Sequence, residues 1–373
     1  MIGDVVKKLV KDLDGLVNEA DLGQPFFSTR NYRPYSFDVN YFSPIIPVES
    51  NRKLAFIDGG NRELVGAPNF SIQLNRVYFN LFMGKQRVPV SHIPQRIEFY
   101  SVTFATFKDD EIVFNTSIFP ILDIYNERLP DSEDLSFSST DRRVMIGISR
   151  GDIARVASIA RRFAEWEYAK HIVDNELDSG DGIVMDGTLR TVFKNESKYA
   201  HAAYGAAKRR GVFYSGLSKT SRLFTDTGLS LLGAVRKMAA DTDVGSTWYY
   251  YPIAKSLSPE HQGTIIIVKL NEQSERVFNY ELYAEQVEAM DTQEINEILS
   301  QLCTNSCDVS FPGYPYGLID ADDKARVRRE EVEMHQILLL SEVSKLGSWS
   351  KFSRHIQSTD AHDVLNMLKG GVE

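Results

Sequence analysis

Lys53-Leu54-Ala55-Phe56-Ile57-Asp58-Gly59-Gly60 is the stretch that decides the fold. Its apolar residues between Lys53 and Asp58 predict a buried strand that ends at the aspartate. The two glycines predict an open turn in which no side chain blocks the carboxylate. An aspartate in a single Asp-Gly pair more often only caps a turn. A second copy of the pattern, Gly182-Ile183-Val184-Met185-Asp186-Gly187, favours two carboxylates that meet at one edge of a sheet.

Length and composition are those of a soluble globular protein. The 373 residues are 43% hydrophobic and 25% charged, enough for a large core in one elaborated domain or two. No apolar run approaches the ~20 residues of a membrane span, and the first residues lack the apolar segment of a signal peptide. Cys303 and Cys307 have no histidine beside them and predict neither a zinc site nor a disulfide framework. We therefore expect a cytoplasmic protein that is not in a membrane.

Positive charge is concentrated in one segment of an acidic chain. The net charge is −9, yet residues 187–240 hold ten Lys and Arg against two acidic residues, a local charge of about +8. A basic segment directly after the second Asp-Gly strand can hold a phosphate backbone, although a solvated helix face is an equal alternative. The candidates for DNA contacts are Arg190, Lys208, Arg209, Arg210, Lys219 and Arg222.

Hydrophobic periodicity predicts a mixed α/β sheet. Alternating residues predict strands, with an antiparallel portion directly after the Asp58 strand, over Phe70–Phe82, Arg96–Phe107, Glu111–Phe119, Val212–Ser215, Trp248–Ile253, Gly263–Leu270 and Val277–Tyr283. Helical spacing predicts helices over Gly3–Leu22, Gly151–Leu177, Lys198–Arg210, Thr292–Leu302 and Ala321–Leu346. Ser149 and Asp152 are both candidates to cap the second of these helices. Strands followed by a helix–strand–helix–strand order indicate a mixed sheet rather than a sandwich.

Two strand carboxylates and one helix carboxylate are what a divalent-metal phosphodiesterase needs. Mg²⁺ and Mn²⁺ prefer oxygen ligands, and a pair of such ions can activate water and stabilise a leaving oxygen. The helix 151–177 offers Glu165 and Glu167, which are two residues apart and therefore point to different faces. Glu165 is favoured because it follows the apolar pair Phe163-Ala164. A salt bridge from either glutamate to Arg161 or Arg162 is the alternative.

Lys219 lies in the turn Gly216-Leu217-Ser218-Lys219-Thr220-Ser221 after a short strand. A lysine there can neutralise charge on a phosphate during cleavage, and the hydroxyls can bond phosphate oxygens. The turn lacks the spacing of a nucleotide-binding phosphate loop, so it does not predict one. The run Tyr249-Tyr250-Tyr251 offers rings that could stack on unpaired bases, although at least two of them are more simply core residues.

Five short strings in this chain are informative together. They are Phe56-Ile57-Asp58-Gly59-Gly60, Arg161-Arg162-Phe163-Ala164-Glu165-Trp166, Val184-Met185-Asp186-Gly187-Thr188-Leu189, Gly216-Leu217-Ser218-Lys219-Thr220-Ser221-Arg222-Leu223 and Pro312-Gly313-Tyr314-Pro315-Tyr316. In this order, between about Asp58 and Val327, they resemble the NurA nucleases of archaea.

The resemblance implies an α/β fold, a ribonuclease-H-like mixed sheet with flanking helices and extra strands. It implies a homodimeric, Mn²⁺-dependent nuclease, with Mg²⁺ as the alternative ion. The expected activities are single-strand endonuclease and 5′-to-3′ exonuclease on single- and double-stranded DNA. The expected partner is a HerA-type hexameric translocase, and the expected role is end resection at double-strand breaks. We expect a helix and connector over residues 1–50, a nuclease domain over 51–330 and a helical extension over 331–373.

The resemblance also assigns roles to site residues. Asp58, Glu165 and Asp186 would be catalytic metal ligands, and Lys219 a catalytic phosphate contact. The chain departs from the family pattern where a histidine is expected shortly after the Pro-Tyr string, because Asp322 stands there. An aspartate can bind a metal but cannot act as a neutral imidazole base. Asp322 is therefore a candidate fourth metal ligand whose role is open.

Two other functional classes fit parts of the sequence. An actin-like or sugar-kinase-like ATPase shares the strand-Asp-Gly pattern, but needs further glycine-rich phosphate turns, for which Asp186-Gly187-Thr188 is the only candidate. A non-catalytic DNA-end clamp or translocase adaptor would use the basic segment and leave the acidic residues structural. ATP hydrolysis by the isolated chain would favour the first class, and metal-independent DNA binding without cleavage the second.

Overall fold

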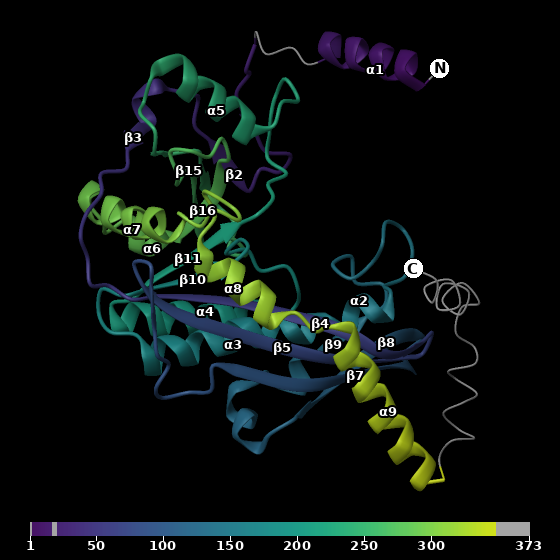
Figure 1. The fold of residues 1–373 in the computed structure, drawn as a ribbon. Helices are drawn as coiled ribbons and strands as arrows, with labels where there is room; N and C mark the ends of the chain where they lie inside the picture. Colours follow the sequence, from purple (N-terminus) through teal and green to yellow (C-terminus); the bar gives the residue numbers. More distant parts are fainter. Residues whose placement is uncertain (1, 17–20, 348–373) are drawn as a thin grey trace.

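One large mixed β-sheet organises the computed structural model, which describes residues 2–16 and 21–347 (Figure 1). Within the described residues it has twelve strands, in the spatial order β3-β13-β15-β16-β11-β10-β4-β5-β7-β8-β9, with β6 paired to β5. Their bounds are β3 (Phe42–Pro44), β4 (Leu54–Ala67), β5 (Phe70–Met83), β6 (Gln86–Val88), β7 (Arg96–Lys108), β8 (Glu111–Pro120), β9 (Ser136–Ser138), β10 (Gly182–Asp186), β11 (Phe213–Ser218), β13 (Trp248–Tyr250), β15 (Gly263–Lys269) and β16 (Phe278–Tyr283).

Strand β4 is the centre of this sheet. It pairs antiparallel with β5, which pairs antiparallel with β7, while on its other side it pairs parallel with β10, and β10 pairs parallel with β11. The order β7-β5-β4-β10-β11, three antiparallel strands and then two parallel ones, is the ribonuclease-H-like core. The predicted mixed sheet with an antiparallel portion after the Asp58 strand is therefore confirmed.

The predicted end of the central strand at Asp58 is wrong. Strand β4 continues through Gly59 and Gly60 as far as Ala67 and stays paired with β5. The two glycines do not form a turn. They are needed because other parts of the chain approach the backbone closely at these positions. A Cβ atom at Gly59 would clash with the carboxylate of Glu165, and one at Gly60 with the backbone oxygen of Ala325.

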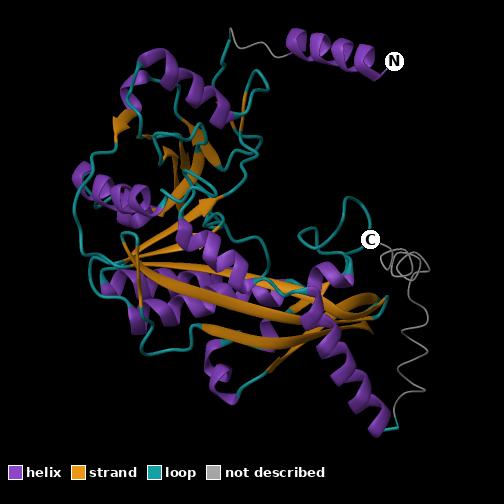
Figure 2. Cartoon of the chain, in the orientation of Figure 1, coloured by secondary structure: helices purple, strands orange, loops and turns teal. Residues whose placement is uncertain are grey.

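Helices cover both faces of the sheet (Figures 1 and 2). Alternate residues of a strand point to opposite faces, so β4 sends Ala55 and Ile57 one way and Leu54 and Phe56 the other. The first pair is in a core cluster with α3 (Ile159–Glu176) and α4 (Glu196–Arg210), and the second pair in a cluster with α7 (Thr292–Asn305) and α8 (Tyr316–Ala325). Asp58 has the parity of Phe56 and so faces α8.

Both long predicted helices are broken. The helix predicted over 151–177 is α2 (Ile153–Ala157) and α3, separated at Ser158, and Asp152 caps it by accepting a hydrogen bond from Ala154 N at 2.8 Å. The helix predicted over 321–346 is α8 and α9 (Arg329–Lys345). Between them Arg326 is extended, because its carbonyl accepts a hydrogen bond at 2.9 Å from the buried side chain of Arg76.

The remaining elements lie around this core. They are α1 (Ile2–Leu16), α5 (Leu231–Thr242), α6 (Ala284–Val287), and the two-stranded sheets β1 (Pro25–Phe26) with β12 (Phe224–Thr225) and β2 (Tyr32–Pro34) with β14 (Ala254–Ser256). Figure 1 shows α1 apart from the rest, and its apolar side chains from Ile2 to Leu13 are exposed. The predicted residues 17–22 of that helix are not helical where they are described, and 17–20 lie outside the described residues.

Two further expectations can be compared with the fold. Tyr249 and Tyr250 are buried in the sheet and are not available to stack on bases. None of the helices in the described part of the chain is long and apolar enough to cross a membrane. The division into 1–50, 51–330 and 331–373 stays a prediction, and the last part extends beyond residue 347, outside the described residues.

Gly317→Ala should destabilise the protein, because a Cβ atom there would clash with the ring of Phe56 and push α8 away from β4. We expect the free energy of unfolding to fall by about 1–3 kcal/mol, measured by urea denaturation. Gly205→Ala is the matched control, because its Cβ would meet only Arg209 Nη1 at 3.6 Å in the middle of α4. That change should raise stability by about 0.5–1 kcal/mol, and equal stability of the two variants would contradict the packing argument.

Candidate metal centre

Three aspartates converge at the α8 face of the central strands. Asp58 lies within β4, Asp186 is the last residue of β10 and Asp322 lies on α8. The parallel register that pairs Met185 with Ile57 sets the first two side by side. One carboxylate oxygen from each of the three lies within 4.8 Å of the others. Carboxylates far apart in sequence are thus brought into one cluster, here called the aspartate cluster.

Asp58 is the carboxylate most perturbed by this arrangement. One of its oxygens accepts a hydrogen bond from Gly59 N at 2.7 Å. Burial, and then the negative charges of Asp186 and Glu165, raise the pKa of Asp58 to about 8. The physical cause is that a desolvated carboxylate next to like charges ionises at a high energetic cost. A cation bound at the cluster would remove that cost.

Lys219 is the cation that the cluster already contains. It follows β11 directly, and its Nζ lies 2.6 Å from Asp186 Oδ2 and 2.8 Å from Asp322 Oδ1. Arg326 adds a second contact to Asp322, at 2.8 Å. Burial opposes ionisation of Asp322, but the hydrogen bonds and charges of Lys219 and Arg326 outweigh it and lower the pKa of Asp322. Lys219 therefore ties together two of the three aspartates.

Tyr314 is a further residue of the site, and no role was predicted for it. It is buried, and its hydroxyl donates a hydrogen bond to Asp186 Oδ1 at 3.3 Å. Its ring lies below the Lys219 ammonium, 5.8 Å from Nζ to the ring centroid. The preceding Gly313 has a φ of 91°, so the turn that delivers the tyrosine requires glycine. The Gly-Tyr-Pro string was the available signal, but a turn has no periodicity that shows where its side chain points.

Glu165 lies next to the aspartate cluster but outside it. Its carboxylate fills the space above Gly59 and forms an ion pair with Arg161, the alternative that the sequence left open. Arg161 also donates to Gly59 O at 3.1 Å and to Asn61 Oδ1 at 2.9 Å. Burial raises the pKa of Glu165, and the charge of Arg161 opposes that shift. Glu167 points elsewhere and pairs with Lys170 and His171.

The chemistry of these donors fits a hard divalent cation. Carboxylate oxygens are the ligands that Mg²⁺ and Mn²⁺ prefer, and the cluster supplies three of them from three different elements. The raised pKa of Asp58 indicates that Lys219 does not neutralise all of the negative charge around this carboxylate. Glu165 would be available as a further ligand if Arg161 released it. The site therefore fits such an ion.

The six predicted DNA contacts divide into two groups. Lys219 is in the cluster, and Arg190 and Arg222 follow β10 and β11 and have no ion-pair partner among the described residues. Lys208, Arg209 and Arg210 are the last residues of α4, next to the start of β11. Asp186 is the last residue of β10, which is parallel to β11, so these three cations and Asp186 lie at opposite ends of the strands. They are engaged in contacts of Lys208 with Glu285 at 2.9 Å, Arg209 with Asp174 at 3.5 Å and Arg210 with Leu177 O at 2.7 Å.

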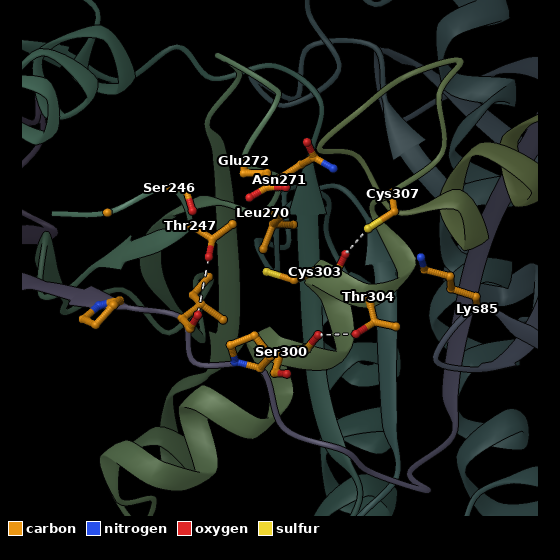
Figure 3. A pocket seen from close by; sticks show the side chains of 14 residues that line it. Lys85, Ser246, Thr247, Leu270, Asn271, Glu272, Ser300, Cys303, Thr304 and Cys307 are labelled. Atoms are coloured by element: carbon orange, nitrogen blue, oxygen red, sulfur yellow. Dashed lines mark hydrogen bonds between the residues drawn. The ribbon is translucent and has the colours of Figure 1, made fainter. Parts of the chain in front are cut away.

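Another cavity, of about 590 Å³, is lined by the side chains that Figure 3 shows. None of the three aspartates lines it. Cys303 and Cys307 do, as free thiols, and Cys307 Sγ donates to Cys303 O at 3.3 Å. Burial raises the pKa of the Cys303 thiol to about 12, which disfavours the reactive thiolate at neutral pH.

Comparison with known proteins gives one family and one matching fold. A family model described as the NurA domain matches residues 52–327, and no curated protein matches. The crystal structure of the NurA nuclease from Sulfolobus solfataricus aligns with a TM-score of 0.51 and 13% identity, over 92% of this chain and 95% of that one. This similarity supports the fold.

Two more remote structures also align. Endonuclease V from Ciona intestinalis, in complex with a 24mer DNA, has a TM-score of 0.35 and 9% identity over 77% of this chain and 89% of that chain. Argonaute from A. aeolicus has a TM-score of 0.27 and 8% identity over 74% of this chain and 29% of that chain. Because the NurA model spans residues 52–327, well over half of the 373 residues, the chain belongs to the NurA family.

Proposed function

We propose that this protein is a divalent-metal-dependent DNA nuclease that hydrolyses phosphodiester bonds at the aspartate cluster. The observation that carries the proposal is the convergence of Asp58, Asp186 and Asp322 within 4.8 Å, with Lys219 between two of them. Membership of the NurA family and the fold of the Sulfolobus nuclease support it. Mn²⁺ is the ion we propose, with Mg²⁺ as the alternative.

The three aspartates would hold the ion, and Glu165 would join them by exchanging Arg161 for it. When bound, such ions activate water for attack on phosphorus and stabilise the leaving oxygen. Tyr314 keeps Asp186 oriented through its hydrogen bond, and Gly59 leaves room for Glu165 beside Asp58. The chain's own residues thus preorganise the oxygens before the ion and the DNA arrive.

Lys219 has a second role once DNA is bound. Its ammonium has three N–H donors and now contacts Asp186 and Asp322. With a divalent ion held by those aspartates, the ammonium of Lys219 would be free to contact a phosphate oxygen. There it stabilises the negative charge that develops during cleavage. Its place at the end of β11, level with Asp186 at the end of β10, supports this assignment.

The family relationship extends the proposal to a pathway. We propose single-strand endonuclease and 5′-to-3′ exonuclease activity, a homodimer, and a HerA-type translocase as partner in the resection of double-strand breaks. The exposed apolar face of α1, from Ile2 to Leu13, supports a protein contact without identifying the partner.

Asp58→Asn should lower cleavage at least about a hundredfold, because it removes a charged ligand from the centre of the cluster. The assay is digestion of end-labelled single- and double-stranded DNA with Mn²⁺, with Mg²⁺ or with EDTA. Asp243→Asn is the control, since it removes an equal charge from an exposed residue with a φ of 52°, which asparagine tolerates. Undiminished Mn²⁺-dependent cleavage by Asp58→Asn would refute the assignment, and binding without any cleavage by wild type would favour the clamp.

The same substitution should stabilise the metal-free protein. In EDTA at pH 8, removing one of several crowded carboxylates relieves repulsion and desolvation, so the free energy of unfolding should rise by about 1–3 kcal/mol. Thermal unfolding measures this change. Added Mn²⁺ should stabilise wild type and have less effect on the variant. A variant less stable than wild type in EDTA would show that Asp58 supports the fold.

Lys219→Ala should separate phosphate contact from metal binding. We expect cleavage to fall by about 10²–10³-fold, because a charge-stabilising donor is lost. Metal affinity without DNA should rise, because Asp186 and Asp322 lose their competing cation. Calorimetric titration with Mn²⁺ measures this second effect, and Lys255→Ala, at an exposed residue of β14, is the control. Weaker metal binding by Lys219→Ala would contradict the competition.

A further inference from the structure

A second cavity adjoins the aspartate cluster. It has a volume of about 390 Å³ and is lined by the loops that follow β10 and β11, among other segments. Thr188 lies two residues after Asp186, and Thr220 follows Lys219 directly, and both line the cavity. The volume falls in the range of about 300–1,000 Å³ that is typical of ligand pockets. A ligand that fills this cavity is therefore a close neighbour of one held at the cluster.

Two exposed aromatic rings line the cavity. Phe26 of β1 and Phe224 of β12 are register partners in their two-stranded sheet, and their exposed fractions are 52% and 51%. Because about half of each ring is exposed, the two side chains gain little stability from burial in the core. Planar rings at the rim of a cavity are suited to stacking on a nucleobase, and such stacking accepts any base.

Two unpaired cations lie on the same cavity. Arg190 and Arg222 line it and form no salt bridge with any described carboxylate. Burial raises the pKa of Tyr32, another lining residue, and the nearby positive charge of Arg190 opposes that shift. Free guanidinium groups attract phosphates, whereas the cations at the end of α4 are already paired. The cavity therefore combines a surface for a base with charges for a phosphate.

The floor of the cavity is polar and buried. Glu281, 1% exposed, accepts hydrogen bonds from Leu189 N at 2.7 Å and from His261 Nε2 at 2.9 Å. His261 Nδ1 is also hydrogen-bonded to the hydroxyl of Tyr32, at 2.8 Å. Asn279, 4% exposed, donates to Glu281 Oε1 at 3.1 Å. The floor of the cavity is therefore held in place by its own hydrogen bonds.

We propose that this cavity is a nucleotide subsite, which takes one unpaired nucleotide of the DNA strand next to the phosphate held at the aspartate cluster. The base stacks on Phe26 and Phe224, while Arg190 and Arg222 hold its phosphate. The inference rests on the proposed nuclease function and adds the reason for a preference for single strands. A paired base cannot enter, because its faces are stacked on neighbouring bases in the duplex.

Equilibrium binding in EDTA tests the base contact without cleavage. The probes are a labelled decathymidylate and a decamer of the same backbone without bases. Wild type should bind the strand with bases about tenfold more tightly. The double variant Phe26→Ala/Phe224→Ala should lose that preference, and both changes are at exposed positions that leave the core intact. Phe107→Ala, at a residue that is 74% exposed on β7, is the matched control and should keep the preference.

A second double variant tests the contact between the two arginines and the phosphate. Arg190→Ala/Arg222→Ala should weaken binding of both strands and reduce the slope of log affinity against log salt by about 1.4, two contacts at ~0.7 each. Arg33→Ala is the control, because its neighbour Tyr32 lines the cavity and successive residues of a strand point to opposite faces. An unchanged salt slope in the double variant would remove the arginines from the site.

The remaining outcomes also decide the proposal. Equal binding of both decamers by wild type, or a base preference that survives in the phenylalanine double variant, would overturn it. Free thymidine monophosphate that competes as well as an unlabelled decamer would show that the occupant is a mononucleotide and not part of a strand. A normal base preference in a protein that cleaves nothing with Mn²⁺ would refute the nuclease function and retain the subsite.

Discussion

The ammonium group of Lys219 holds together carboxylates that would otherwise repel one another. Asp186 ends a strand and Asp322 lies on a helix from the far end of the sequence, and both contact the same Nζ at 2.6 and 2.8 Å. The packing of α8 against β4 keeps Asp322 within reach of Lys219. Gly317 lets α8 approach the ring of Phe56, and Gly60 lets the end of α8 approach β4. The helix that carries Asp322 is thereby fixed against the strand that carries Asp58.

One lysine is too little charge for this cluster. Asp58, buried beside Asp186 and Glu165, has a pKa raised to about 8, so the metal-free site favours a proton there. Under the proposed function, a divalent cation would take the place of that proton and would compete with Lys219 for the same oxygens. Metal and phosphate binding would then be coupled, because Asp186 and Asp322 would no longer need the ammonium group of Lys219. The lysine is a counter-ion to these two aspartates in the structure and would be a phosphate ligand in the complex with metal and DNA.

The sequence predicted those features that depend on local pattern. Alternation predicted the strands, and the repeated Asp-Gly pattern predicted that Asp58 and Asp186 meet. Features that depend on distant residues were not predictable. Gly59 and Gly60 looked like a turn because nothing local shows that Glu165 and Ala325 approach them. The break between α8 and α9 depends on Arg76, 250 residues away in sequence from the carbonyl it binds.

Counting charges in the sequence also overstated how many cations are free. Seven of the ten basic residues between 187 and 240 have acidic, backbone or other partners in the fold, and the partners of Lys208, Arg209 and Arg210 come from outside that segment. A cation that is already paired adds little to the field that a phosphate meets. Arg190 and Arg222, which follow the same two strands as Asp186 and Lys219, form no ion pair with any residue that the structure describes.

The proposed function and the proposed subsite together give a path for a DNA strand. A phosphate held at the aspartate cluster would lie next to the loops that carry Thr188 and Thr220, and both loops lead to Arg190, Arg222 and the exposed pair Phe26 and Phe224. Charge alone would also draw the backbone of a duplex there. The rings would add stacking that only an unstacked base can make. Selection for single strands would therefore be a property of the cavity beside the cluster, and the carboxylates themselves would need only a phosphate.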